Sequence, residues 1–146
     1  MKKLFKFIAI PVIALTAVFF AGPKTDFEEF DNECEIVWAD SIRKTEYAIV
    51  YLHGYSASKG EGEPIHRDMA KKYGCNLYLP RLFQHGLNDD DAFVKLTPIG
   101  LVESAKEAIA VGKLLGEKVI LLSSSTGSTL SIYLAADDSK VHSLAM

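Results

Sequence analysis

Residues 118–128 read KVILLSSSTGS, and this stretch decides how the rest of the chain is interpreted. After Lys118, residues 119–122 are a short apolar run, which is typical of a strand buried on both faces of a parallel sheet. Small hydroxyl residues follow at 123–126, then Gly127, and the pattern over 126–136 predicts a helix. The stretch therefore predicts a sharp strand-to-helix turn that is crowded with serines.

The same alternation of short apolar runs and amphipathic segments extends through the chain. We predict strands over 33–39, 48–52, 76–79, 118–122 and 142–146. Further helices are predicted over 64–73, with Ile65, Met69 and Tyr73 on one face, and over 98–115, with a stripe of Leu101, Ala105, Ala108, Gly112 and Leu115. Strands that alternate with amphipathic helices indicate an α/β fold with a mostly parallel sheet and helices on both faces.

The spacing of small residues selects one serine from the cluster. A strand-to-helix turn can expose a serine as a nucleophile when the residues two before and two after it are very small. Only Ser125 meets this condition, with Ser123 before it and Gly127 after it. Its place at a helix N-terminus would also favour developing negative charge. The alternative is that the serine merely caps the helix.

A second loop, His53-Gly54-Tyr55-Ser56, directly follows the apolar run 48–52. Acyl transfer needs fixed N–H donors for an oxyanion. The backbone amides of Tyr55 and Thr126 are the candidates, and Gly54 lets the backbone approach a substrate closely. We interpret His53 as a residue that shapes this loop and not as a general base.

These segments, taken together, resemble the α/β-hydrolase family in its esterase, lipase and serine-peptidase-like branch. LHGYSAS at 52–58 resembles the oxyanion loop, LPRLFQHG at 79–86 resembles the Pro…Gly-His-Gly segment, and VILLSSSTGS at 119–128 resembles the strand and nucleophile elbow. Gln84 and Ser123 stand where that family usually has glycine. The resemblance implies a serine hydrolase for a small-molecule carboxylic ester or related acyl bond, without metal or cofactor.

A serine nucleophile also needs a histidine base and an acid, which follow it along the chain in this family. Asp137, Asp138 and His142 follow Ser125 too closely, because the sheet would carry them to its other end. We therefore expect the acid and the histidine to lie beyond residue 146, so that 33–146 is a partial domain, incomplete at its C-terminal side. The alternative is a non-catalytic or decayed binding domain. A flavodoxin-like or nucleotide-binding fold is disfavoured because the glycine-rich phosphate motifs are absent.

The N-terminal residues have a different character. Lys2, Lys3 and Lys6 precede the uncharged stretch 7–22, which predicts a hydrophobic helix serving as a membrane anchor or signal segment. The acidic stretch 23–32 would be a linker. We expect an anchored domain outside the cytoplasm, or alternatively a secreted or periplasmic one; a buried helix of a soluble protein is the third possibility. The net charge of −3 and the lack of a basic patch argue against a nucleic-acid partner, and the oligomeric state stays open.

Overall fold

The computed structural model describes residues 32–87, 92–136 and 138–146. Within these residues the strands are β1 (Glu35–Val37), β2 (Thr45–Leu52), β3 (Asn76–Leu79), β4 (Gly116–Ser123) and β5 (Val141–Ala145). The helices are α2 (Ile65–Tyr73), α3 (Pro98–Leu115) and α4 (Ser125–Ala135), with a short 3₁₀ helix, η1 (Lys59–Gly62). The predicted N-terminal anchor and most of the predicted linker lie outside the described residues.

The strands form one sheet in the order β1-β3-β2-β4-β5. The pairs β3–β2, β2–β4 and β4–β5 are parallel, which confirms the predicted mostly parallel sheet. β1 pairs with β3 in the antiparallel direction. The sequence pattern did not reveal this difference, because an apolar run carries no information about strand direction.

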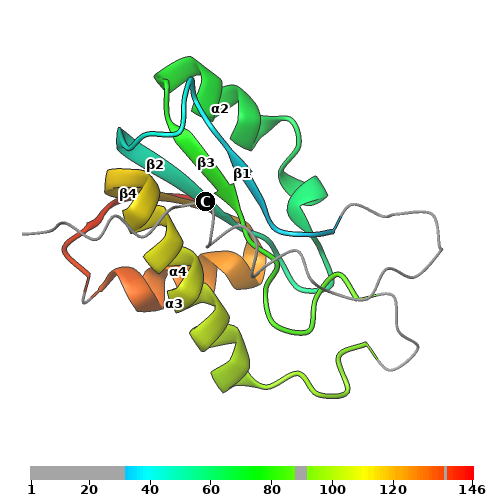
Figure 1. Cartoon of the computed structure of the whole chain (residues 1–146). Coiled ribbons are helices and arrows are strands. Elements are labelled where there is room, and N and C mark those ends of the chain that lie inside the picture. Colours follow the sequence, from blue (N-terminus) through cyan, green and yellow to red (C-terminus); the bar gives the residue numbers. More distant parts are fainter. Residues whose placement is uncertain (1–31, 88–91, 137) are drawn as a thin grey trace, which may run out of the picture. The chain divides into compact units, whose positions relative to one another are not determined.

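Helices cover both faces of the sheet, as alternation along β2 shows. Ala48, Val50 and Leu52 belong to a core shared with residues of α3 and α4. Ile49 and Tyr51 point the other way, into a second core that includes residues of α2. In Figure 1, α2 accordingly lies apart from α3 and α4. The predicted stripe on α3 is also close to the sheet, since a Cβ on Gly112 would lie 2.5 Å from Cγ2 of Val50.

Of the apolar face predicted for α2, only Met69 packs against the core, and it is half-buried. Ile65 and Tyr73 are 60% and 62% exposed, whereas His66 and Ala70 are buried. His66 is accommodated because its Nε2 pairs with the carbonyl of Lys59 at 2.9 Å and its ring packs on Tyr51. A polar residue thus occupies the core position that the apolar spacing assigned to its neighbour.

Several element boundaries also differ from the predictions. β2 begins at Thr45, three residues earlier than expected, and α3 passes directly into β4 at Gly116 without a loop. The segment 54–62, whose three glycines and two serines predict a loop, contains η1. Ser58 caps η1 by accepting a hydrogen bond from the Gly60 N–H. This small helix matters because it brings a carboxylate to the candidate site.

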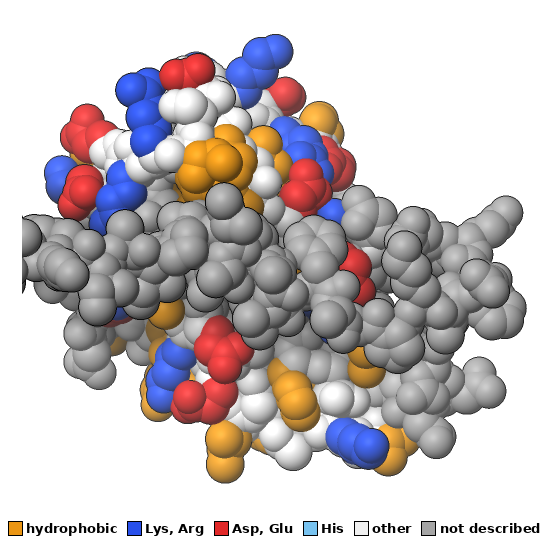
Figure 2. All heavy atoms as spheres, in the orientation of Figure 1, with side chains coloured by type: hydrophobic (Ala, Val, Ile, Leu, Met, Phe, Trp, Pro, Cys, Tyr) orange, Lys and Arg blue, Asp and Glu red, His pale blue; other side chains and the backbone are white. Residues whose placement is uncertain are grey.

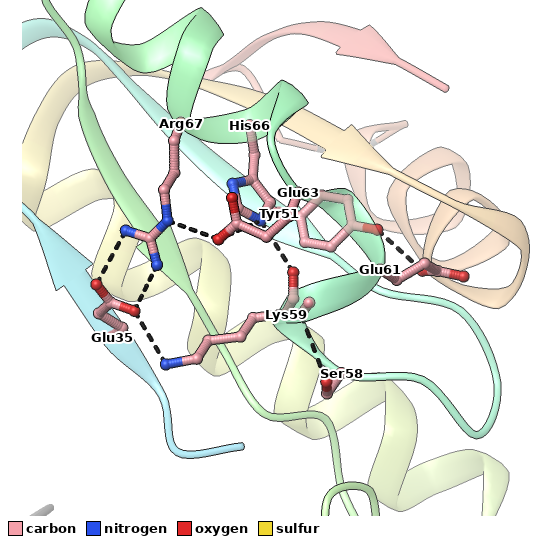
Figure 3. A network of polar contacts seen from close by, with 9 residues as sticks. Glu35, Tyr51, Ser58, Lys59, Glu61, Glu63, His66 and Arg67 are labelled. Carbon is pink, nitrogen blue, oxygen red and sulfur yellow. Dashed lines mark hydrogen bonds and ion pairs between the residues drawn. The ribbon is translucent and has the colours of Figure 1, made fainter. Parts of the chain in front are cut away.

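An ionic network joins β1, η1 and α2 (Figure 3). Arg67 donates to both oxygens of Glu35, at 3.0 and 2.8 Å, and Lys59 Nζ donates to Glu35 Oε2 at 2.9 Å. The hydrogen bond from Arg67 is the main reason that the pKa of Glu35 falls to about 2, with Lys59 adding to it.

On the face shown in Figure 2, acidic and basic side chains are interspersed. Among the helices of the described residues, none is long and apolar enough to cross a membrane.

Candidate active site

Two loops meet at the carboxyl ends of neighbouring parallel strands. Leu52 at the end of β2 is in register with Ser123 at the end of β4, so the segments that follow these two strands leave the sheet at the same level. The N–H of Ser124 then donates to the carbonyl of Leu52 at 3.1 Å. The residues predicted from two separate motifs are thereby brought together at the edge where α/β sheets place their sites.

Ser125 is the first residue of α4 and is exposed. Its φ of +47° lies in the left-handed region, which costs a non-glycine residue about 1–2 kcal/mol. Strain of this kind persists only where the surroundings impose it, and here the strand, the turn and the helix fix the chain on both sides. Among residues 123–126, Ser125 alone has this conformation.

Gly127 is required because α4 lies directly against the end of β2. A Cβ placed on Gly127 would lie 2.0 Å from the carbonyl oxygen of Leu52 and 2.8 Å from that of His53. Both neighbours are backbone atoms, which cannot move aside as a flexible side chain would. The glycine two residues after Ser125 is therefore demanded by close approach of the helix to the other loop.

Ser123 occupies the small position two residues before Ser125. It is buried in β4, and its φ lies outside the left-handed region, so its backbone does not demand glycine. The Ser123 hydroxyl has no hydrogen-bond partner among the described residues. A buried polar group without a partner costs free energy.

Replacing Ser123 with alanine is expected to raise the free energy of unfolding by about 1 kcal/mol, because it removes the unpaired hydroxyl and keeps the Cβ. Urea unfolding measures the change. The exposed Ser139→Ala variant serves as the control and should shift stability by less than about 0.5 kcal/mol. A loss of stability in Ser123→Ala would show that the hydroxyl has a partner in solution.

His53 is fully buried. Its Nδ1 lies 2.9 Å from the carbonyl of Gly54, and the N–H of Leu82 donates to its Nε2 at 3.2 Å. Because a carbonyl only accepts, Nδ1 carries the proton and the ring is neutral. Burial, helped by the nearby His85, lowers the pKa of His53 and outweighs the opposing effects of the Gly54 carbonyl and Glu61. Both ring nitrogens are engaged, which leaves neither free for a proton from Ser125.

Gly54 brings the loop after β2 against the nucleophile candidate. A Cβ on Gly54 would lie 3.3 Å from Cβ of Ser125. The next residue, Tyr55, has an N–H that makes no hydrogen bond within the described part of the chain. Thr126 is the second residue of α4, and first-turn amides have no partner inside a helix. Of the two amides predicted as oxyanion donors, one thus lies in the loop after β2 and the other in the first turn of α4.

Glu61, on η1, is a residue of this site that the sequence interpretation missed. Its Oε2 accepts the Gly54 N–H at 2.7 Å and the Tyr51 hydroxyl at 2.9 Å, while Oε1 accepts the Ser124 hydroxyl at 3.4 Å. Burial acts to raise the pKa of Glu61, but these hydrogen bonds outweigh it and the pKa is lowered. The only signal in the sequence is a glutamate between two glycines in the segment after a strand.

The third motif, at 79–86, packs beside the same loop. Gln84 has a φ of +59°, and Gly86 has a φ of +62°. His85 is buried and packs edge-on against Tyr55, with ring centroids 5.8 Å apart. The side chains of Glu61 and Phe93 help to line a shallow hollow of about 440 Å³ next to these residues.

Asp138 and His142 lie away from Ser125. Asp138 follows α4 and pairs with Lys113. His142 is on β5, with its ring 5.2 Å from that of Tyr47, near the start of β2. Asp137 and Asp89–91 fall outside the described residues. Over 32–87, 92–136 and 138–146, no group of three or more His, Cys, Asp and Glu side chains is placed to hold a metal ion.

Comparison with known proteins places the fold. No family model and no curated protein sequence matches the chain. Among solved structures, it is similar to one described with LipS and LipT, two metagenome-derived lipolytic enzymes, with a TM-score of 0.61 and 16% sequence identity. The match covers 71% of this chain and 40% of the other, so this chain spans well under half of that protein. At this identity the likeness concerns the fold alone, a mixed α/β arrangement consistent with an α/β-hydrolase-like fold.

Proposed function

We propose that this chain carries the nucleophile and the oxyanion hole of a serine hydrolase that cleaves a carboxylic ester or a related acyl bond. The observation that carries the proposal is the exposed Ser125 at a φ of +47°, held in register beside a glycine-containing loop with a free amide. The lipolytic protein of similar fold makes an ester the first class of substrate to test.

In the proposed reaction, the Ser125 hydroxyl oxygen attacks the acyl carbon and its proton passes to a base. The Tyr55 and Thr126 amides would donate to the oxygen that becomes negatively charged. The carbonyl then reforms, the alcohol leaves with the proton, and an acyl-serine remains. Attack by water on that ester releases the acid and restores Ser125.

The base and its orienting acid would come from outside the described residues. His53 has both nitrogens engaged, and His142 lies at the other end of the strands. His66 is held on α2 by the Lys59 carbonyl, and His85 is buried with its Nδ1 against the carbonyl of Phe83, so it is not exposed to a substrate beside Ser125. We therefore propose that the triad acid and histidine are missing from this chain, and that the chain by itself hydrolyses esters slowly or not at all.

A non-catalytic binding domain is the second candidate. Gln84 and Ser123 favour it, because one places a side chain on a left-handed backbone and the other buries an unpaired hydroxyl. Such features are expected where selection for a working elbow has relaxed.

In either case we propose that 1–22 anchors the domain to a membrane and places it outside the cytoplasm, on the basis of the lysines that precede an uncharged stretch.

Labelling with a fluorophosphonate tests the proposal. The protein is expressed from its natural gene with whatever downstream sequence that gene encodes, and also as residues 1–146. We expect the gene product to gain one phosphonyl group at Ser125, with at least about 100-fold slower labelling of the shorter chain because it has no base. Intact mass and peptide mass spectrometry measure both.

Matched serine variants identify the reacting residue. Ser125→Ala should abolish labelling, whereas Ser128→Ala, one helical turn away, should label like the natural protein. Equal labelling of Ser125→Ala would refute the assignment. A folded gene product that neither labels nor hydrolyses p-nitrophenyl esters would favour the binding domain instead.

A further inference from the structure

Glu61 joins the two loops of the candidate site. Its carboxylate accepts hydrogen bonds from Gly54 in the loop after β2 and from Ser124 in the turn after β4. It also accepts the hydroxyl of Tyr51, which comes from inside β2. One side chain therefore connects the sheet, the oxyanion loop and the residue that precedes the nucleophile.

The contact with Gly54 determines which amide stays free. At 2.7 Å, the Gly54 N–H is committed to the Glu61 carboxylate, whereas the following N–H, that of Tyr55, has no partner in the described part of the chain. Successive amides in a turn point in different directions. A hydrogen bond to a charged group is stronger than one to a neutral group. Fixing the Gly54 N–H in this way therefore restricts the orientation of the Tyr55 N–H.

Glu61 is held in place because η1, the short helix that carries it, is bound to neighbouring elements (Figure 3). The backbone carbonyl of Lys59 pairs with Nε2 of the buried His66, and the Lys59 ammonium pairs with Glu35. Gly62 allows the tight fit, because a Cβ there would lie 2.5 Å from Cδ2 of His66 and 2.7 Å from Cζ of Tyr51. The carboxylate is thus presented by a short helix that is tied to the core.

The charge of Glu61 makes a purely electrostatic contribution to catalysis implausible. A carboxylate next to an oxyanion hole repels the negative charge that develops there. A positioning role avoids this repulsion problem, because three hydrogen-bond donors already stabilise the negative charge of Glu61.

We propose that Glu61 is a positioning residue, which fixes the oxyanion loop against the nucleophile turn by accepting the N–H of Gly54. The inference rests on the proposed hydrolase function for its kinetic consequence. Its structural part, the ordering of the Gly54 amide, holds independently of catalysis.

Three variants of the natural gene product test the role. Glu61→Ala removes the acceptor, Glu61→Gln keeps an acceptor oxygen without the charge, and Glu63→Gln changes a nearby carboxylate that pairs with Arg67. We expect Glu61→Ala to lower kcat for a p-nitrophenyl ester roughly 10- to 100-fold with KM within about threefold, since misplacement of a donor affects the transition state most. Glu61→Gln should stay within about fivefold, and Glu63→Gln should match the natural protein.

Amide hydrogen exchange of Gly54 is measured on the same proteins. We expect exchange to be at least about tenfold faster in Glu61→Ala than in Glu61→Gln, with Glu63→Gln unchanged. Equal losses of kcat in Glu61→Ala and Glu61→Gln, or a loss confined to KM, would overturn the positioning role. Unchanged Gly54 exchange in Glu61→Ala would overturn it even if no variant hydrolyses esters, whereas failure of the natural protein to label at Ser125 would overturn only the proposed function.

Discussion

Replacing Gly127 with alanine is expected to lower the free energy of unfolding by at least about 3 kcal/mol, more than the same change at any other glycine that the structure describes. The added Cβ would lie 2.0 Å from the Leu52 carbonyl oxygen and 2.5 Å from its carbon. Relief requires α4 to move away from the end of β2, and that movement breaks the hydrogen bond from Ser124 to Leu52. Urea unfolding, followed by the fluorescence of the single tryptophan, Trp38, measures the loss.

Gly60→Ala is the matched control, because a Cβ on Gly60 would meet only the Ser58 hydroxyl, at an ordinary 3.7 Å. Its effect should stay below about 1 kcal/mol. If Gly127→Ala also stayed below that value, the close approach of α4 to the oxyanion loop would be incorrect. The elbow would then lack the geometry on which the proposed function depends.

The features that could be predicted from the sequence are those that depend on neighbours along the chain. Residues 77–79 of β3 and 119–122 of β4 are uninterrupted apolar runs, which is typical of strands covered on both faces. The turn at Ser125 was predicted for a similar reason, since the need for Gly127 follows from the geometry of a strand that turns sharply into a helix. The two loops were expected at the carboxyl ends of parallel strands, whereas the register of Leu52 with Ser123 was not predicted and is seen only in the structure.

The features that could not be predicted depend on contacts between distant segments. Glu61 has no periodicity or motif around it, and its role arises only when η1 folds back against Gly54. His66 is buried because the Lys59 carbonyl and the Tyr51 ring happen to meet it, which the spacing of apolar residues cannot show. Predictions about Ser125 itself remain predictions until labelling tests them.

His53 connects stability to pH at the same site. The neutral ring is held by the Gly54 carbonyl and the Leu82 N–H, and burial lowers its pKa from the ordinary value of 6.5. Below about pH 6.5, His53 therefore becomes protonated in the unfolded chain while it stays neutral in the folded chain. This contribution of His53 is complete above pH 6.5 and falls as the pH decreases toward the lowered pKa, by up to about 1.4 kcal/mol per pH unit.

Replacing His53 with phenylalanine should lower the free energy of unfolding by about 3 kcal/mol at pH 7.5, because the buried Leu82 N–H and Gly54 carbonyl each lose a partner. The variant should also lose the His53 part of the decrease between pH 7.5 and 5.5, as measured by urea unfolding at both values. The exposed His142→Gln variant controls for removal of a histidine and should keep both the stability and the decrease. Glu35 does not interfere, since its lowered pKa of about 2 confines its effect to pH values below about 4.5. A decrease that persists unchanged in His53→Phe would mean that His53 is protonated in the folded protein. The interpretation of His53 as a neutral ring that shapes the oxyanion loop would then be wrong.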